Sequence, residues 1–473
     1  MKTIYKLLML SGMTLGVASC GDSFLDLQPQ QAISNDVFLQ SLQDFESAIA
    51  GGMDQMQNAD WYGRYFMLVP DVMGEDVKQN ASANRAKEWA EYNGSDVDFI
   101  PEEIWAEVYE GINIANSIIN STYEAPTAIQ AEFNNIVGQA YALRALAHFD
   151  LVRIYAQHYT FTADASHAGI PIVTVYDVES RPSRNTVKEV YDQVIADFNQ
   201  AISLMTIDPP SAGHFSKEAA QALLSRVYLY KEDYANAESL ATAVINSGKY
   251  NLVANGSYAD QFLTGNSSEA ILEIVFSLAD NPGSDHLGGM YKESGYGDYL
   301  PSNDLFNIMT DGDVRKTMFA TDVNLSGIYG SLRVNKYPSS GADIGTDNLP
   351  VIRLSEVYLN RAEARAKSGN DAGAQADVDL IRQRGFAAAP AVTATGAALV
   401  TEILNERRVE LCFEGHRIFD ITRNKGSVIR TDCTAPTTPV NACAINYPND
   451  RFILPIPDGE TNVNENIAQN PGY

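Results

Sequence analysis

The longest regular pattern of apolar positions lies between residues 128 and 158. Apolar side chains recur there at steps of three and four, as on one face of an α-helix, at Phe133, Ile136, Ala140, Leu143, Ala147, Leu151 and Ile154. A second apolar stripe follows Val137, Tyr141, Phe149 and Val152. Because a helix with two apolar faces packs on both sides, this pattern predicts a helix inside an array of helices.

Shorter segments repeat the helical spacing, at 186–205, 216–231, 235–247, 351–368 and 372–384. Ser216 is a favourable N-cap, and Gly248 and Gly369 are placed to end helices. The spacing of a tetratricopeptide repeat is matched by Leu224, Tyr228, Ala237, Ala241 and Val244. In such a repeat, small side chains let antiparallel helices approach closely. The segments therefore predict two helix pairs, and 128–158 with 186–205 predicts a third, more divergent pair.

The segment 281–350 lacks this periodicity. It holds 10 of the 33 glycines in 70 of the 473 residues, about twice its share. Residues 269–276, just before it, favour a buried strand, and the segment 60–105 is similarly irregular. Loop-rich excursions from a rigid scaffold commonly carry binding sites. The predicted fold is mainly α, with tetratricopeptide-like helix pairs forming a superhelical scaffold and an irregular loop-rich region containing short strands.

The N-terminus has the pattern of a bacterial lipoprotein signal. Lys2 and Lys6 flank the start of an apolar run, Leu7 to Val17, which is too short to span a bilayer. Small residues then lead directly into Cys20, as in the processing box where a cysteine thiol is acylated. We expect a signal peptide at 1–19, a lipidated tether at 20–35 and one domain at 36–473, with its loop-rich ligand region at about 281–350.

The excess of acidic residues excludes two classes of binding partner. The formal net charge is -27, from 33 basic and 60 acidic residues. That balance argues against binding nucleic acid, which needs clustered Lys and Arg, and against docking on anionic lipid through basic side chains. No segment reaches about 18 uninterrupted apolar residues. The mature protein is therefore expected to be anchored to a membrane by Cys20 without crossing it.

The other cysteines and the histidines suggest no metal chemistry. Cys433 and Cys443 lie in a Pro/Thr-rich loop, where an exported protein allows a disulfide, and the sequence leaves that pairing open. Cys412 lies between two apolar residues and is interpreted as a buried thiol. No zinc-ligand spacing occurs, and the six histidines form no metal motif. We expect no cofactor; whether a metal ion is bound stays open.

Residues 405–423 carry the most specific motif, NERRVELCFEGHRIFDITR. It resembles the C-terminal signature of the SusD/RagB family, E-R-x-x-E-L-x-F-E-G-x-R-x-F-D-x-x-R. Other parts are similar to that family, in chain order, at Cys20 to Pro29, Arg144 to Asp150, Leu354 to Leu359, Ala362 to Ala364, Phe452 to Pro457, Asn464, and Gln469 to Tyr473. The resemblance therefore covers the whole chain.

This resemblance implies a surface lipoprotein of Bacteroidetes, facing the cell exterior from the outer membrane. Such a protein captures oligomers, most often glycans and sometimes peptides. It delivers them to a SusC-like TonB-dependent transporter and catalyses nothing. Two alternatives remain: a helical-repeat scaffold that binds only protein, and a surface glycoside hydrolase. A hydrolase would turn over an oligosaccharide, whereas a scaffold would bind the transporter and show no affinity for a ligand.

The charged residues of the 405–423 motif are interpreted as structural. The motif is expected to form one helix and its exit, with Gly415 breaking the helix near its end. This segment carries His416 and four acids, Glu406, Glu410, Glu414 and Asp420. Arg407 and Glu410 are three residues apart, as are Arg417 and Asp420, so each pair is expected to share a helix face. Glycoside hydrolysis needs two carboxyl groups facing each other, and no local motif selects such a pair.

Aromatic residues supply the ligand-binding candidates, because flat rings match the C–H faces of sugars while polar neighbours bond the hydroxyls. The candidates are Trp89, Tyr92 and Asn93 in the polar stretch 84–93, and Tyr291, Tyr296 and Tyr299 in the glycine-rich excursion. We expect these rings to be exposed where 84–93 meets 281–300. Trp105 and His148 lie on helical patterns and are expected to be packed rather than to bind a ligand.

Overall fold

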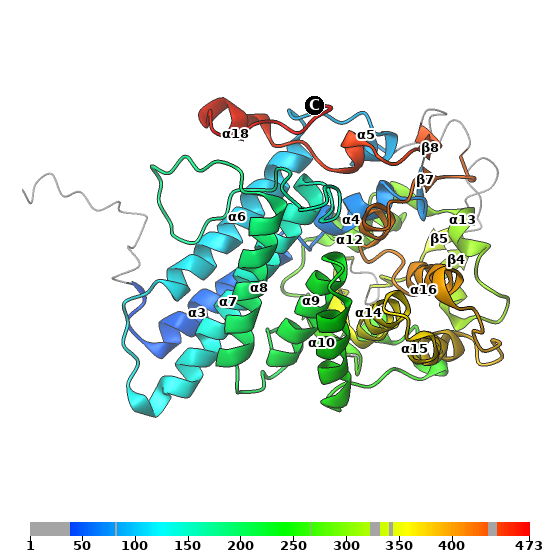
Figure 1. Ribbon diagram of the computed structural model, residues 1–473, viewed down its shortest axis with the longest axis horizontal. Helices are drawn as coiled ribbons and strands as arrows, with labels where there is room; N and C mark the ends of the chain where they lie inside the picture. Colours follow the sequence, from blue (N-terminus) through cyan, green and yellow to red (C-terminus); the bar gives the residue numbers. More distant parts are fainter. Residues whose placement is uncertain (1–37, 81–82, 266, 322–331, 340–343, 434–441) are drawn as a thin grey trace, which may run out of the picture.

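Long helices follow one another across the molecule in chain order (Figure 1). The computed structural model describes residues 38–80, 83–265, 267–321, 332–339, 344–433 and 442–473. Its long helices are α3 (Leu42–Gln57), α6 (Phe99–Ile119), α7 (Gln130–Tyr155), α8 (Val187–Leu204), α9 (Lys217–Tyr230), α10 (Tyr234–Asn246), α14 (Leu354–Lys367), α15 (Asp371–Gly385) and α16 (Gly396–Glu410). Each packs on the next, and α16 also packs on α14. The predicted mainly α, tetratricopeptide-like fold is confirmed.

The helices predicted from periodicity form within a few residues of their expected bounds, as α7, α8, α9, α10, α14 and α15. The hydroxyl of Ser216 caps α9 by accepting from the amide of Ala219 at 2.9 Å. Gly248 and Gly369 follow the ends of α10 and α14 with φ of +67° and +83°. Residues other than glycine seldom adopt that backbone conformation, so both glycines end their helices as expected.

Helix α7 packs against α6 on one side and α8 on another, which confirms its two apolar faces. Its Arg144 is buried and donates to both carboxylate oxygens of Asp197 on α8, at 2.8 and 2.7 Å. His148 is fully buried, and its Nε2 accepts from the amide of Val173 at 3.2 Å. Burial lowers the pKa of His148 to about 4, so the ring is neutral and packed, as predicted.

The rest of the described chain consists of short elements. Its strands are β1 (Val77–Gln79), β2 (Ala270–Ile274), β3 (Tyr299–Pro301), β4 (Phe319–Thr321), β5 (Leu332–Val334), β6 (Leu349–Arg353), β7 (Val428–Ile429) and β8 (Ala444–Ile445). Its short helices are α4 (Tyr65–Val72), α5 (Lys87–Glu91), α11 (Gln261–Thr264), α12 (Leu287–Tyr291), α13 (Asn303–Phe306), α17 (Arg417–Arg423) and α18 (Asp458–Val463), with 3-10 turns η2 (Thr127–Ile129), η3 (Asn255–Ser257), η4 (Gly283–Asp285), η5 (Val314–Met318) and η7 (Asp450–Phe452). The strands pair antiparallel as β1–β3, β2–β6, β4–β5 and β7–β8.

The β1–β3 pair joins the two irregular segments. Val77 pairs with Pro301 and Gln79 with Tyr299, and the amide of Asn80 donates to the carbonyl of Asp298 at 2.7 Å. The early irregular segment and the glycine-rich excursion are therefore held together by backbone hydrogen bonds. The predicted strand at 269–276 forms as β2, which is buried along its whole length and pairs with β6.

The C-terminal segment crosses the ends of α6 and α7, at the top of Figure 1. The amide of Leu454 donates to the carbonyl of Ile154 at 2.8 Å. The side-chain amide of Asn470 donates to the carbonyls of Tyr155 and Leu454, at 2.8 and 2.7 Å. Family-like residues at the chain end therefore fasten the last segment onto α7.

Cys433 and Cys443 form a disulfide, which answers the question that the sequence left open. Cys412 is a free thiol with 4% exposure, as expected for a buried cysteine. Cys20 and the signal sequence lie outside the described residues. Among the described residues, no helix has both the length and the apolar character needed to cross a membrane.

Ala241 on α10 provides a test of the close helix packing. This residue is fully buried where α10 packs on α9 and α14. We expect Ala241→Leu to lower the free energy of unfolding by about 1–3 kcal/mol, because added methylene groups overpack the contact. Ala243→Leu, at an exposed position of the same helix, is the matched control. Equal urea midpoints for the two variants would contradict the prediction.

Candidate functional site

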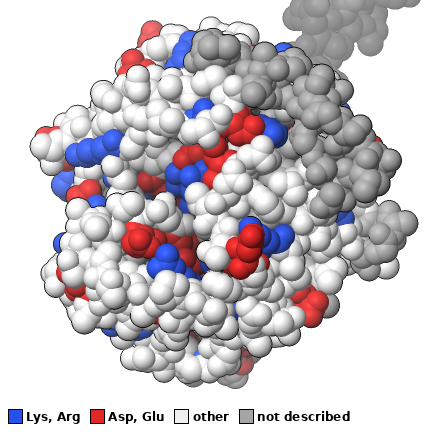
Figure 2. Space-filling model, turned by 90° about the vertical axis from the view of Figure 1, so that its right-hand side faces the viewer, with Lys and Arg blue, Asp and Glu red and all other residues white. Residues whose placement is uncertain are grey.

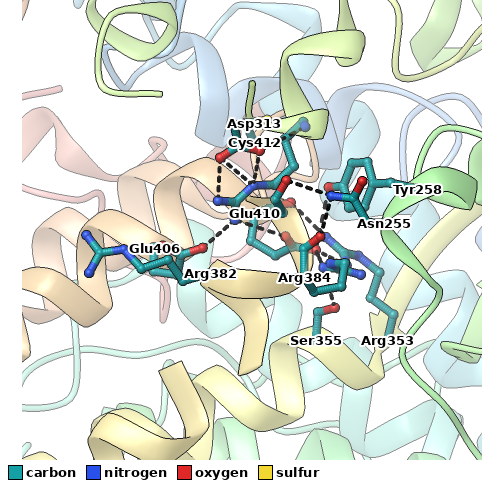
Figure 3. A network of polar contacts seen from close by, with 12 residues as sticks. Asn255, Tyr258, Asp313, Arg353, Ser355, Arg382, Arg384, Glu406, Glu410 and Cys412 are labelled. Carbon is teal, nitrogen blue, oxygen red and sulfur yellow. Dashed lines mark hydrogen bonds and ion pairs between the residues drawn. The ribbon is translucent and has the colours of Figure 1, made fainter. Parts of the chain in front are cut away.

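The C-terminal motif forms a buried network of ion pairs (Figure 3). Arg353 donates to Glu410 Oε1 at 2.6 Å and to Glu414 Oε1 at 2.7 Å. Arg384 donates to Glu410 Oε1 at 2.5 Å, and Arg315 lies 3.3 Å from its Oε2. Burial alone would raise the pKa of Glu410, but the three guanidinium groups outweigh it and hold the pKa well below its usual range.

A second part of the network lies around α17. Asp420 accepts from Arg407 at 3.1 Å and from Arg423 at 2.9 Å, and Arg423 also binds both oxygens of Glu363. All four side chains are nearly inaccessible to solvent. These contacts join α14, α16 and α17, so the structural interpretation of the motif is supported by its geometry.

The individual pairs predicted within the motif are wrong. Arg407 contacts Asp420 rather than Glu410, and Arg417 forms an ion pair with Glu75 instead of Asp420. Each predicted pair does lie within one helix, Arg407 and Glu410 in α16 and Arg417 and Asp420 in α17. The two arginines bind instead to carboxylates on other elements, so helical spacing within the motif does not decide the pairs.

The turn between α16 and α17 is anchored to α4. Phe413 and Gly415 have φ of +64° and +72°, which reverses the chain. The carboxylate of Asp71 accepts from the amide of Gly415 at 3.0 Å. A Cβ on Gly415 would lie 2.9 Å from the carbonyl oxygen of Met67, so the position requires glycine. Burial raises the pKa of Asp71 to about 8.

The aromatic candidates do not form one exposed cluster. Trp89, Tyr291 and Tyr299 are 2%, 1% and 0% exposed, so the expectation that these rings face solvent is wrong. The ring of Trp89 packs over Gly94. Tyr291 lies near the ring of Tyr337, nearly parallel to it. The physical reason is that the pairing of β1 with β3 and the packing of α12 bury parts of the segments 84–93 and 281–300 in the core.

The remaining candidates differ in exposure. Tyr92 is half-buried, with its hydroxyl donating to the carbonyl of Met73 and the guanidinium of Arg430 5.6 Å from its ring centroid. Asn93 is exposed at the end of α5. Trp105 is 5% exposed and packs edge-on against Tyr155, which confirms its prediction as a core residue.

Tyr296 lies in a cluster of polar side chains where the two segments meet. The Arg85 guanidinium lies 3.3 Å from its ring centroid and donates to Asp298 at 3.2 Å. The Tyr296 hydroxyl donates to Asp285 at 2.9 Å, and Arg64 also pairs with Asp285. We call Arg85, Asp285, Tyr296 and Asp298 the Arg85–Tyr296 face. The side chains of Asp285 and Arg85 are 50% and 31% exposed.

Sequence reasoning missed the charged members of this face. Arg85 lies inside the polar stretch 84–93 and Asp298 inside the glycine-rich excursion, so both segments were selected without these residues. Nothing in the local sequence distinguishes Arg64 or Asp285 from the other charged residues of the chain. Their role becomes visible only when η4 is placed beside α4.

A separate hollow of about 230 Å³ opens between α15, α16 and the segment after α13. Residues of opposite charge line it, including Asp313, Arg315, Arg382, Glu402 and Glu406. Figure 2 views the right-hand side of the molecule and shows acidic and basic side chains together in a depression of that face. Among the described residues, no group of His, Cys, Asp and Glu side chains has the arrangement of a metal site.

The fold is a helical-repeat scaffold with a polar face where its two irregular segments meet. Two family models match it: SusD family over residues 317–473, and starch-binding associating with outer membrane over residues 23–229. The chain belongs to the SusD/RagB family, whose members bind carbohydrate.

Relatives match over nearly the whole length. SusD-like protein P2 of Formosa agariphila is 25% identical, over 97% of this chain and 98% of its own. A Bacteroides vulgatus protein, provisionally named a sugar binding protein, has a structure with a TM-score of 0.84 and 30% identity, covering 92% of this chain and 99% of its own. A SusD superfamily protein of Bacteroides thetaiotaomicron gives 0.83 and 29%, over 91% and 100%.

The pair formed by Glu356 and Arg226 yields a prediction about pH. Arg226 donates to both oxygens of Glu356 at 2.6 Å, in the buried contact between α9 and α14. Burial opposes ionisation of Glu356, but Arg226 outweighs it and lowers the pKa from 4.5 to about 2. A lowered folded-state pKa stabilises the protein above the unfolded value and is lost as pH falls.

We expect this carboxyl to contribute about 3 kcal/mol at neutral pH, lost between pH 4.5 and about 2. Glu356→Gln should be less stable at pH 7 and show a shallower loss of stability across that range. Glu110→Gln, at an exposed helical position, is the control. Urea unfolding at a series of pH values measures both slopes, and parallel curves for Glu356→Gln and the parent would overturn the prediction.

Proposed function

We propose that the protein is a surface-exposed lipoprotein that captures oligomers, most often glycans, and delivers them to a SusC-like TonB-dependent outer-membrane transporter. The match with SusD-like proteins along nearly the whole chain carries this proposal. One matching family model is described as starch-binding and associating with the outer membrane. The protein acts by binding and release rather than catalysis, since the motif carboxylates at 406–420 are engaged in structural ion pairs.

The ligand-binding surface proposed for this function is the Arg85–Tyr296 face. It joins the half-buried ring of Tyr296 to the partly exposed side chains of Asp285 and Arg85, which suits the apolar faces and hydroxyl rims of sugars. Asn93 extends the candidates at the end of α5. The buried Tyr299 supports this face from below, since its hydroxyl donates to the carbonyl of Arg85 at 2.8 Å. Trp89 and Tyr291 are packed in the core.

Three assays separate this function from its alternatives. Affinity electrophoresis through amylopectin, laminarin, xylan and pectin gels tests glycan capture, and product analysis of the same mixtures tests hydrolysis. Recovery of a large outer-membrane protein with the tagged chain from detergent-solubilised native membranes tests the transporter partner. Partner recovery without retardation in any gel would favour a scaffold that binds only protein, and release of shorter oligomers would favour a hydrolase.

Membrane anchoring is tested at Cys20. Cys20→Ala removes the thiol that would accept the lipid, so the protein should move from the membrane to the soluble fraction. Ser19→Ala, which keeps the thiol, is the matched control. Labelled palmitate should enter the parent and the control but not the Cys20 variant. Retention of Cys20→Ala in salt-washed membranes would contradict the proposed anchor.

The Arg85–Tyr296 face is tested at its ring. Tyr296→Ala should weaken binding to the retained polysaccharide about tenfold, because a stacked aromatic contact contributes roughly 1–1.5 kcal/mol. Tyr176→Ala, at a tyrosine that is 59% exposed elsewhere, is the control. Calorimetry with the matching oligosaccharide measures both affinities. Equal affinity of the two variants would exclude this face as the ligand site.

A further inference from the structure

The hollow beside α15 and α16, which we call the α15–α16 hollow, is built by elements other than those of the Arg85–Tyr296 face. The side chains used below are Met309, Asp313, Arg315, Phe386, Glu402 and Glu406. They come from the segment after α13, from η5, and from the facing ends of α15 and α16. Its volume of about 230 Å³ lies below the roughly 300–1,000 Å³ of pockets for drug-sized ligands. The space therefore suits a single ring rather than an oligomer.

The inner wall of the hollow consists of paired charged side chains, and one of their carboxylate oxygens can still accept a hydrogen bond. Arg315 donates to both oxygens of Asp313, at 2.9 and 2.7 Å, and also pairs with Glu406 Oε1. Glu406 Oε2 lies 3.9 Å from Nε of Arg382, too far for a direct hydrogen bond. This oxygen therefore has room for a donor between itself and the rim.

The rim and floor complete a site with polar and apolar sides. Arg382 donates to Glu402 at 3.0 Å, and their side chains are 31% and 40% exposed. Phe386 is half-buried in the lining, and Met309 is 4% exposed beside it. A flat ring and a thioether thus adjoin carboxylate oxygens.

We infer that the α15–α16 hollow binds one neutral sugar ring, as a second glycan subsite distant in sequence from the Arg85–Tyr296 face. Sugar hydroxyls donate to Glu406 and Glu402, while the C–H face lies on Phe386. A cationic ligand would have to compete with Arg315 and Arg382 for carboxylates that they already bind. An anionic sugar would meet the acidic inner wall. This inference rests on the proposed function and deepens it.

Two subsites on one chain change how polymers are held. A long glycan engaging both would rebind at one subsite before leaving the other, so its retention exceeds that of either contact alone. A short oligomer that fills only one subsite gains nothing. The pairing therefore favours capture of polymers over free sugars.

The test observes Met309 directly, by nuclear magnetic resonance of isotope-labelled methionine methyl groups in the full chain. Met309→Leu assigns its signal. The methyl glycosides of glucose, galactose, mannose and xylose are the neutral probes, and glucuronate is the charged comparison. We expect a saturable shift of the Met309 signal with at least one neutral glycoside and none with glucuronate.

Ala389, which lines the hollow, allows the site to be blocked without removing a polar contact. Ala389→Trp should abolish the shift, while Ala388→Trp, an exposed neighbour outside the lining, should keep it. If Ala389→Trp fails to fold, Phe386→Leu replaces it and should weaken the titration about tenfold. An absent shift with every neutral glycoside, an equal shift with glucuronate, or an unchanged titration in the blocked variant would each overturn the inference.

Affinity electrophoresis of the same preparation distinguishes the two failures. Retardation by a polysaccharide without a Met309 shift removes the second subsite and leaves the proposed function standing. Loss of both removes the proposed function as well. With both present, Ala389→Trp should reduce polymer retention about tenfold while the affinity of a disaccharide at the Arg85–Tyr296 face stays unchanged.

Discussion

The contact of Arg353 with Glu410 and Glu414 organises the C-terminal half of the molecule. Arg353 ends β6 and immediately precedes α14, whereas its partners end α16 and follow it. Removing either the arginine or a glutamate would leave a buried charge without a partner, which lowers the free energy of unfolding by several kcal/mol. A buried ion pair of this kind adds little net stability over a well-packed apolar core. Its role here is geometric, because Arg353 and Arg384 tie the ends of β6 and α15 to the end of α16.

The same network links the scaffold to both candidate binding surfaces. Arg315 is shared between Glu410 inside the network and Asp313 on the wall of the α15–α16 hollow. On the other side, Asp71 receives the turn at Gly415 and belongs to α4, which begins next to Arg64. The irregular segments are therefore positioned by the C-terminal motif, which also supplies Glu406 to the α15–α16 hollow. Rigid support of this type lets loops hold a site with little regular structure of their own.

Sequence patterns predicted six of the long helices, gave no bounds for α6 or α16, and missed α3 entirely. That helix contains adjacent glycines, Gly51 and Gly52, which weaken a helical signal. A Cβ on Gly52 would lie 2.6 Å from a methyl group of Leu143, so the glycine allows α3 to pack closely. The requirement comes from a residue about 90 positions away, and no local pattern contains it. Tertiary contact overrides propensity in the same way at Tyr299, where strand pairing buries a ring that its polar neighbours suggested was exposed.

Charges in the 405–423 motif were correctly interpreted as an ion-pair network. Apart from Asp420 and Arg423, which are three residues apart, their partners could not be found by spacing. Glu75, which pairs with Arg417, is more than 300 residues away in the chain. Helical spacing predicts partners only within one continuous helix, whereas Arg407 and Arg417 bind carboxylates that other elements supply. The Arg85–Tyr296 face shows the same limit, since its members come from two segments that meet through β1–β3.

Cys412 adjoins the buried ion-pair network, since its backbone carbonyl accepts from Lys336 Nζ at 2.9 Å. It is the one cysteine of the described residues outside a disulfide. Burial raises its pKa to about 12, so it does not react with thiol reagents while the core stays closed. Its labelling rate therefore counts openings of the surrounding core. Measured during glycan binding or transporter docking, that labelling rate would report how often the buried charged core opens.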